Sequence, residues 1–309
     1  MMELQYKNLL VAFVVALFLP NVLPCWHDST SPYADKWNAN KEVCGTLNDN
    51  NKIVNGNSVT STYTWPWLGI MKRSGSFRCT VELIAPNWAT TAAHCVDVDR
   101  YNQPILASQL TVTFGQANKA SSNIWSTQAR GVSQIILHNG WSRSSARNDI
   151  AILRLSSAVS YTTRVRPVCM QHPGSENDDL LDGNCWVAGW GSLTTGGSTP
   201  SYLQDLKVDV ISNPTCVAQA SPSPFEVTPN HICVEGIAAG SGLCNGDSGG
   251  PLMCKYGDTD WLLLGITSFK THSQCGTTGK PDVFTRMSSY GQWVTDTIDA
   301  RGGPGTVTV

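Results

Sequence analysis

Charged residues are scarce in this chain. Of its 309 residues, 14% are Asp, Glu, Lys or Arg, and the net charge is -2. Neither a basic block nor an acidic tail occurs, so the sequence does not favour binding to nucleic acid or to a polyanionic surface. The chain also lacks an Asn-x-Ser/Thr sequon with a permitted middle residue, and N-glycosylation is therefore not expected.

Long hydrophobic runs are almost absent. The prominent one, Leu9 to Leu19, follows Lys7 and ends before Pro20. It is shorter than the about 20 residues that span a bilayer, and it fits the hydrophobic region of a secretory signal peptide. We expect residues 1–24 to be a cleaved signal, with an uncleaved anchor as the alternative. The expected location is therefore extracellular, with no membrane contact after cleavage.

The cysteines lack the spacing of a metal site. None of the eleven forms a Cys-x-x-Cys pair, whereas zinc usually needs clustered ligands. Cysteines spread along a secreted chain favour disulfides instead. An odd number leaves at least one cysteine that is removed, free or paired to another chain. The loop from Gly115 to Ile124 lacks the carboxylates of a calcium site, so we expect neither a metal nor a cofactor.

Short apolar runs separated by Gly, Asn, Ser and Pro dominate the rest of the chain. Runs such as Leu110–Phe114 and Ile150–Leu153 have the length and spacing of strands in an all-β sandwich or barrel. The segment Tyr290–Ile298 has helical spacing and is the best helix candidate. Residues 25–52 are mostly polar, which predicts a flexible propeptide, and residues 302–309 form a tail.

Three segments carry residues suited to catalysis: Thr91-Ala92-Ala93-His94-Cys95, Asn148-Asp149-Ile150-Ala151 and Gly246-Asp247-Ser248-Gly249-Gly250-Pro251. Each alone has a structural explanation, such as a tight turn. Together they supply a hydroxyl, a base to remove its proton, and a carboxylate to orient that base. Their conjunction in one Cys-rich chain favours nucleophilic catalysis.

These segments resemble the trypsin/chymotrypsin family of secreted serine proteases, including its chymotrypsin- and elastase-like zymogens. Further matches are Ile53-Val54-Asn55-Gly56, Trp65-Pro66-Trp67, Cys185-Trp186-Val187-Ala188-Gly189-Trp190-Gly191 and Gly265-Ile266-Thr267-Ser268. The resemblance covers Ile53 to about Ala300 and implies a catalytic domain over residues 53–301. Its implied fold is two six-stranded antiparallel β-barrels, roughly 53–165 and 166–301, with a C-terminal helix.

The resemblance implies roles for single residues. Ser248 would be the nucleophile, His94 the general base, and Asp149 the carboxylate that orients the imidazole. The N–H groups of Gly246 and Ser248 would form the oxyanion hole. Ser268 resembles the family serine that contacts this carboxylate and shapes the substrate-binding strand. The chain order His, Asp, Ser matches this family and differs from subtilisin and the α/β-hydrolases.

Activation by cleavage is also implied. Cutting the Lys52–Ile53 bond creates an α-amino group on Ile53, which in similar proteins pairs with the Asp before the nucleophile, here Asp247. Breaking such a buried pair costs about 3–5 kcal/mol, enough to keep a precursor inactive. Two departures are noted: Asn55 replaces a glycine, and Phe77 replaces a histidine that holds this Asp in some zymogens.

Family resemblance further implies five disulfides. The pairs are Cys79–Cys95, Cys185–Cys254, Cys216–Cys233, Cys244–Cys275 and Cys44–Cys169. The last pair would tether the propeptide after cleavage. Cys25 remains, and it either leaves with the signal peptide or bridges to another chain.

The expected S1 pocket, which receives the residue before the scissile bond (P1), departs from that of trypsin. Gly242 stands at the base where trypsin has Asp, while Asp282 stands at a wall position that is commonly Gly. Leu243 adds apolar bulk, and Ser268 and Lys270 complete the implied substrate-binding set. A P1 Lys or Arg would satisfy Asp282, which favours basic or broad specificity. Alternatively Lys270 pairs with Asp282, and small or apolar P1 residues are favoured.

Two hypotheses follow for function. The first is a secreted serine endopeptidase, made as a zymogen, that acts as a monomer on protein or peptide substrates. Its further partners would be an activating protease and protein inhibitors. The alternative is a catalytically weak or silent homologue that acts as a binding protein, because Thr80-Val81 replace the usual Gly-Gly after Cys79 and Lys270 stands where open pockets usually have Gly. All three triad residues are present, which favours the enzyme.

Overall fold

The structure is a computed structural model that describes residues 44–47, 58–59, 64–121, 127–170, 183–220, 225–256 and 260–303. The expected signal peptide, most of the expected propeptide, Cys25, the Lys52–Ile53 bond and the last six residues lie outside these ranges.

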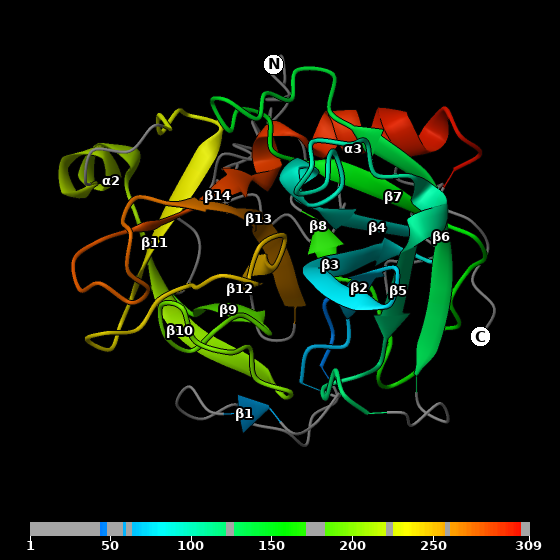
Figure 1. Ribbon diagram of the computed structural model, residues 1–309, viewed down its shortest axis with the longest axis horizontal. Coiled ribbons are helices and arrows are strands. Elements are labelled where there is room, and N and C mark those ends of the chain that lie inside the picture. Colours follow the sequence, from blue (N-terminus) through cyan, green and yellow to red (C-terminus); the bar gives the residue numbers. More distant parts are fainter. Residues whose placement is uncertain are drawn as a thin grey trace, which may run out of the picture.

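The first half of the described chain forms a closed antiparallel barrel (Figure 1). In the order β2-β3-β4-β7-β6-β5, its strands are β2 (Leu68–Arg73), β3 (Ser76–Ala85), β4 (Trp88–Thr91), β7 (Ala151–Leu155), β6 (Gln128–Leu137) and β5 (Leu110–Phe114). Strand β5 shows the expected alternation, because Leu110, Val112 and Phe114 are buried while Thr111 is exposed. Its apolar face therefore fills the barrel.

The second half forms another six-stranded antiparallel barrel, which the pairing of β9 with β10 closes. Its strands are β9 (Cys185–Gly189), β10 (Leu203–Ile211), β11 (His231–Gly236), β12 (Pro251–Tyr256), β13 (Asp260–Lys270) and β14 (Asp282–Arg286). Two short strands join its sheet: β1 (Ser58–Val59) pairs with β10, and β8 (Cys169–Met170) runs parallel to β13. The predicted pair of six-stranded barrels is confirmed.

In the described part of the chain, two α-helices accompany the barrels. Helix α3 (Gly291–Asp299) matches the predicted C-terminal helix to within one residue, and its Val294 and Ile298 join the main core. Helix α2 (Asn213–Gln219) was not predicted. It begins after Ser212, whose hydroxyl accepts a hydrogen bond from the backbone of the first turn. Only one of its residues is buried, so no apolar periodicity marks it in the sequence.

Among the described residues, five disulfides fasten the two barrels and their loops: Cys44–Cys169, Cys79–Cys95, Cys185–Cys254, Cys216–Cys233 and Cys244–Cys275. The same pairs are implied by the resemblance. The segment around Cys44 is built into the domain, since Gly45 N donates to Pro167 O and Gly45 O accepts from Trp261 N. A side chain at Gly45 would lie 2.6 Å from Trp261 O, so this contact requires glycine.

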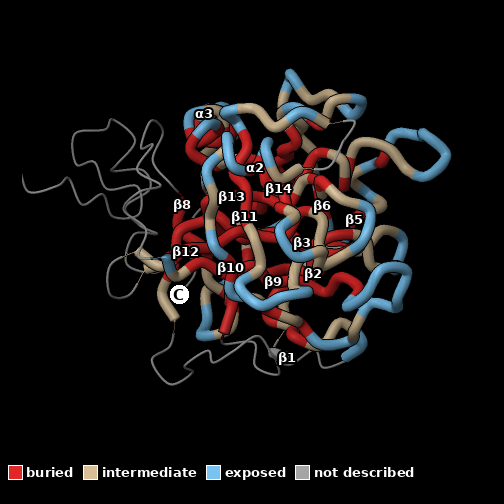
Figure 2. The backbone as a smooth tube through the Cα atoms, turned by 90° about the vertical axis from the view of Figure 1, so that its left-hand side faces the viewer, coloured by how far each residue is buried: buried red, intermediate tan, exposed pale blue. Residues whose placement is uncertain are grey.

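Buried residues run through the interior, and exposed ones gather in the surrounding loops (Figure 2). The barrels meet along a packed seam, where Trp67 Nε1 donates to Met253 Sδ at 2.8 Å.

Glu82 on β3 is also fully buried, and its carboxyl oxygens have no hydrogen-bond partner in the described part of the chain. Burial raises the pKa of Glu82 well above its usual range, so the group is kept neutral.

Candidate active site

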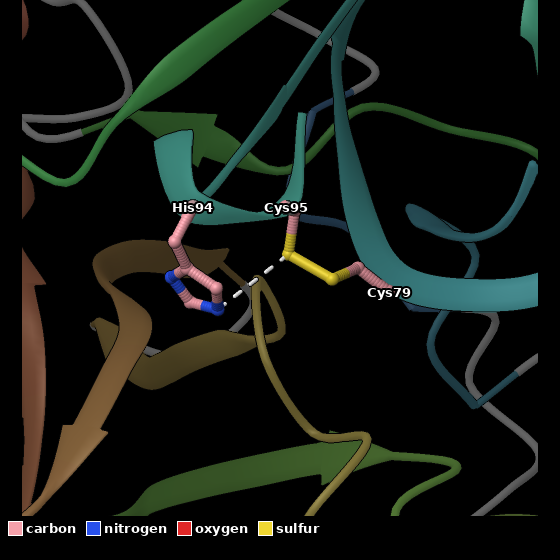
Figure 3. A group of neighbouring side chains, drawn as sticks. All are labelled: Cys79, His94 and Cys95. Atoms are coloured by element: carbon pink, nitrogen blue, oxygen red, sulfur yellow. Dashed lines mark hydrogen bonds between the residues drawn. A yellow bond between two sulfur atoms is a disulfide. The ribbon is translucent and has the colours of Figure 1, made fainter. Parts of the chain in front are cut away.

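His94 sits on a short 3-10 turn (Ala93–Cys95) between the two barrels. Its Nδ1 lies 2.7 Å from Asp149 Oδ2, and its backbone N–H donates to Asp149 Oδ1 at 2.9 Å. The Cys79–Cys95 disulfide ties this turn to β3, and Figure 3 shows the imidazole projecting beside that disulfide. Because Nδ1 faces a carboxylate, it carries the proton, and Nε2, which lies 3.8 Å from Cys95 Sγ, keeps its lone pair as a base.

Several hydrogen bonds fix the position of Asp149. Its side chain is 1% exposed, and besides His94 it accepts a hydrogen bond from Ser268 Oγ at 2.6 Å. Its backbone carbonyl accepts one from Thr285 Oγ1 at 2.9 Å. Both hydroxyls come from neighbouring strands of the second barrel, β13 and β14, so the carboxylate of the first barrel is fixed by the second. This arrangement orients the imidazole of His94.

Ser248 lies on the loop between β11 and β12. Its carbonyl accepts a hydrogen bond from Thr80 N at 3.1 Å, and the N–H of Gly249 donates to Thr267 O at 3.0 Å. These bonds place Ser248 between β3 and β13, whose residues contact His94 and Asp149. Among the described residues no hydrogen bond joins the hydroxyl to His94. Such contacts are often long in free enzymes and tighten when substrate binds.

The loop around Ser248 presents two N–H groups, those of Gly246 and Ser248, that donate no hydrogen bond within the described part of the chain. Gly246 and Gly249 have φ values of 102° and 73°, which glycine adopts without strain. A side chain at Gly249 would also lie 2.2 Å from Thr91 Oγ1. In the described part of the chain, the hydrogen bonds include none donated by the N–H of Gly246 or Ser248. These donors are therefore available to a substrate oxyanion.

The carboxylate of Asp247 accepts hydrogen bonds from Gly191 N at 2.8 Å and Cys244 N at 2.9 Å. Desolvation raises the pKa of Asp247, against the effect of these bonds and of the charges on Lys270 and Lys119. In the described part of the chain, no cation lies within ion-pair distance of this carboxylate. It is therefore suited to receive an ammonium group.

A cavity of about 220 Å³ opens beside Asp247. Two glycines make room for the carboxylate, because a Cβ on Gly189 or Gly191 would lie 2.3 Å from its oxygens. Other lining residues include Leu193, Gln204, Leu206 and Gly240–Leu243. The cavity therefore offers a positively charged group access to Asp247.

Of the expected S1 residues, Gly242, Leu243 and Lys270 adjoin Asp282, whereas the hydroxyl of Ser268 bonds to Asp149. The Asp282 side chain is buried, and its Oδ2 accepts a hydrogen bond from Leu243 N at 2.8 Å, while Oδ1 has no partner among the described residues. Burial raises the pKa of Asp282 to about 7, against the effects of the Leu243 bond and of Lys270, while Asp247 raises it further. A Cβ on Gly242 would lie 3.1 Å from Oδ2, so the base of the pocket adjoins this carboxyl.

Lys270 does not neutralise Asp282. The two residues are paired across β13 and β14, but the Nζ atom of Lys270 lies 3.3 Å from Cys275 Sγ. The ion pairs of the described residues do not include these two. The alternative in which Lys270 fills the pocket by pairing with Asp282 is therefore not the arrangement observed.

Thr80 and Val81 are accommodated without blocking the cleft. Val81 is fully buried inside the first barrel, where its Cγ2 would lie 2.7 Å from a Cβ on Gly69. Thr80 is buried as well, and its N–H makes the bond to Ser248 described above. Their side chains therefore give no support to a silent site.

A network around His94 was not predicted. Asp97 accepts hydrogen bonds from Trp141 Nε1 and Arg143 Nε, both at 2.9 Å. Arg143 also donates to the carbonyl of His94 at 3.2 Å. The network joins the loops on both sides of the imidazole, and no short motif marks it because its members are more than 40 residues apart.

The residues beside His94 do not fit a metal. The ligand atoms of Cys79, His94 and Cys95 lie within 4.8 Å of one another. Both sulfur atoms are bonded to each other, so neither is a thiolate and only one imidazole remains as a donor. A structural zinc site needs about four such ligands.

Comparisons with known proteins agree with this geometry. The family model Trypsin matches residues 53–294. The chain is 34% identical to the human (Homo sapiens) transmembrane protease serine 11B over 259 residues, which cover 82% of this chain and 58% of the relative. It is 33% identical to the rat (Rattus norvegicus) transmembrane protease serine 11G over 243 residues, 79% of this chain and 54% of the relative.

The chain thus spans little more than half the length of these two relatives. In the described part of the chain, no helix is long and apolar enough to cross a membrane. The match to the Trypsin model extends from the start of the expected catalytic domain into helix α3 and includes both barrels. This chain belongs to the trypsin family.

Proposed function

We propose that the protein is a serine endopeptidase that hydrolyses peptide bonds through an acyl-enzyme. The observation that carries this is the hydrogen-bonded His94–Asp149 pair next to a serine loop with two unused N–H donors. Ser248 Oγ attacks the scissile carbonyl while His94 Nε2 takes its proton. The N–H groups of Gly246 and Ser248 bind the oxyanion, and His94 then protonates the leaving amine. Water, deprotonated by His94, then attacks the acyl carbon, the bond to Ser248 Oγ breaks, and His94 returns the proton to Ser248 Oγ.

The test is covalent labelling by a fluorophosphonate after cleavage at Lys52–Ile53. This probe reacts with an activated serine, so the cleaved protein should be labelled at Ser248 and the Ser248→Ala variant should not. An unlabelled, correctly cleaved protein would favour the binding-protein hypothesis instead.

The proposal includes synthesis as a zymogen that another protease cleaves at Lys52–Ile53. The cavity beside Asp247 supports it, because it lies next to a carboxylate that has no cationic partner in the described residues. Strand β1 pairs with β10 at Gln204, which lines the same cavity. Ser58 lies five positions after Ile53 in the sequence, and a segment of that length reaches at most about 17 Å. The new α-amino group would enter the cavity and pair with Asp247.

We expect the Asp247→Asn variant, once cleaved, to lose about 100- to 1000-fold in kcat/KM, since half of a buried ion pair is removed. The uncleaved precursors of the variant and the wild type should be equally weak. Asp209→Asn, an exposed acidic residue on β10, is the matched control. A cleaved Asp247→Asn enzyme within tenfold of wild type would contradict this activation mechanism.

For specificity we propose a basic or broad P1 preference. Asp282 supports it, because its Oδ1 is buried and has no hydrogen-bond partner among the described residues. A Lys or Arg side chain from the substrate would supply the missing donor.

Asp282→Asn should lower kcat/KM for Lys or Arg at P1 by at least about 30-fold, through loss of a paired charge. Substrates with a small apolar P1 should change little. In the wild type, the ratio of the two kcat/KM values should rise with pH through about 7, as Asp282 becomes ionised. The ionisation of the general base affects both substrates and cancels in this ratio.

In Asp282→Asn the same ratio should be flat with pH. An unchanged preference for Lys and Arg in the variant, or a wild-type ratio independent of pH, would contradict the role of Asp282. The groups that face this carboxyl are the N–H of Leu243 and the charges of Lys270 and Asp247.

The proposed location is extracellular. The apolar run Leu9–Leu19 would act as a signal that is cleaved, or else as an anchor. The names of both relatives describe transmembrane proteases, which keeps the second arrangement open. Either arrangement delivers the catalytic domain to an oxidising compartment, where five disulfides persist. The protein would act as a monomer on protein or peptide substrates and would be subject to protein inhibitors.

A further inference from the structure

Lys119 stands out among the charged side chains near the active site. It lies between β5 and β6, and its Nζ donates to Thr199 Oγ1 at 2.5 Å and to Trp190 O at 3.4 Å. The same ammonium lies 4.7 Å from the centre of the Phe77 ring. Two neutral acceptors and an aromatic face thus hold a cation on the wall of the cleft.

The charge of Lys119 is not neutralised locally. In the described part of the chain, no carboxylate lies within ion-pair distance of it, and the undescribed residues 122–126 that follow contain no Asp or Glu. Burial lowers the pKa of Lys119, while the more distant Asp247 acts to raise it. The site therefore holds a partly desolvated cation with one donor position left for an anion.

This cation adjoins the proposed oxyanion donor. Thr199 Cγ2 and Phe77 Cε1 lie 3.5 and 3.6 Å from the place that a Cβ of Gly246 would occupy. Phe77 lies on β3 three residues before Thr80, whose N–H donates to the carbonyl of Ser248. Ser268 and Lys270 of the expected S1 set lie on β13, so we place the acyl part of a substrate along this strand and the part after the scissile bond, the primed side, beside Phe77 and Lys119.

The alternation of side chains along an extended peptide indicates which substrate residue reaches Lys119. Successive side chains of a strand point to opposite faces, so P1 and P2′, the second residue after the scissile bond, point to the same face. The P1 side chain points below the nucleophile loop toward Gly242 and Asp282. P1′ then faces His94 and the Cys79–Cys95 disulfide, while P2′ points back toward Gly246 and the residues that flank it.

We propose that Lys119 and Phe77 form a subsite that selects an acidic side chain at P2′. The inference rests on the proposed endopeptidase function and adds a substrate class to it. Asp or Glu would accept a hydrogen bond from the ammonium, and its methylene groups would lie against the Phe77 ring.

The experiment uses the cleaved, full-length enzyme and internally quenched peptides that share one optimised P1 residue. Only P2′ varies, among Glu, Gln and Lys. For the wild type we expect kcat/KM with Glu to exceed that with Gln by about 5- to 20-fold, between the value of an exposed ion pair and that of a charge-assisted hydrogen bond. Lys119→Gln should abolish this difference, and Lys119→Glu should favour Lys at P2′.

Lys207→Gln is the matched control, since it removes one positive charge from an exposed position on β10. It should keep the preference for Glu. A wild type that does not distinguish Glu from Gln, or a Lys119→Gln variant that still does, would overturn the subsite. If the enzyme is labelled by the fluorophosphonate in that case, the endopeptidase function stands. If it is neither labelled nor cleaves any peptide, both proposals fail.

Discussion

Replacing Ser248 by alanine is expected to lower kcat for peptide hydrolysis about a million-fold, while KM changes little. The methyl group removes the nucleophile, but the pocket around Asp282 and the N–H donors of Gly246 and residue 248 remain. The residual rate should still exceed that of the uncatalysed reaction by about 1000-fold or more, because the oxyanion hole continues to act. Hydrolysis of an internally quenched peptide by the cleaved enzyme measures both values.

Ser157→Ala, an exposed serine after β7, is the matched control and should behave as wild type. Combining Ser248→Ala with Asp149→Asn should cost hardly more than Ser248→Ala alone, because the residues act as one unit. A Ser248→Ala enzyme that keeps more than about 1% of wild-type kcat would show that another group supplies the nucleophile.

The Asp149→Asn variant should lose about 10,000-fold in kcat, the effect of the corresponding change elsewhere in this family. All three hydrogen-bond donors around this carboxylate are fixed. Oδ2 accepts from His94 Nδ1 and Ser268 Oγ, and Oδ1 accepts from His94 N. An amide has one oxygen, so its NH₂ group would face a donor, and the imidazole would move its proton to Nε2. His94 could then no longer act as the base.

The fold of the Asp149→Asn variant should be unchanged, since the amide has the same shape. Asp209→Asn, on the exposed face of β10, is the control for a change of one charge. Active-site titration of the cleaved enzyme, followed by measurement of kcat, separates loss of rate from loss of folded protein. A variant within tenfold of wild type would show that Asp149 does not set the tautomer.

Local patterns predicted the class of the fold, but the number and closure of the barrels came from the family resemblance. Leu110–Phe114 alternates as a half-buried strand should, and Tyr290–Ile298 has the period of a helix. The pairing of β9 with β10 joins segments separated by a long loop, and alternation within a strand does not name its partner. Helix α2 has too few buried residues to show a period.

The residues of the site also fall into those that a local sequence motif predicted and those that it did not. Motifs marked His94, Asp149 and Ser248 because each stands in a distinctive local sequence. Thr285 bonds to Asp149 across 136 residues, and Lys119 bonds to Thr199 across 80, so neither contact leaves a local signal. The sequence also placed Lys270 near Asp282 but left their pairing open, and the direction of the Lys270 side chain toward Cys275 depends on packing.

The Cys44–Cys169 bridge joins the chain before Lys52 to the start of the second barrel, and hydrogen bonds through Gly45 dock it there. Cleavage at Lys52–Ile53 would therefore activate the enzyme without releasing it from the part of the chain that precedes Cys44. If that part is an anchor, the active protease stays at the cell surface, and its substrates are those that reach the membrane. Release would need a second event, either a cut upstream of Cys44 or reduction of this one bond.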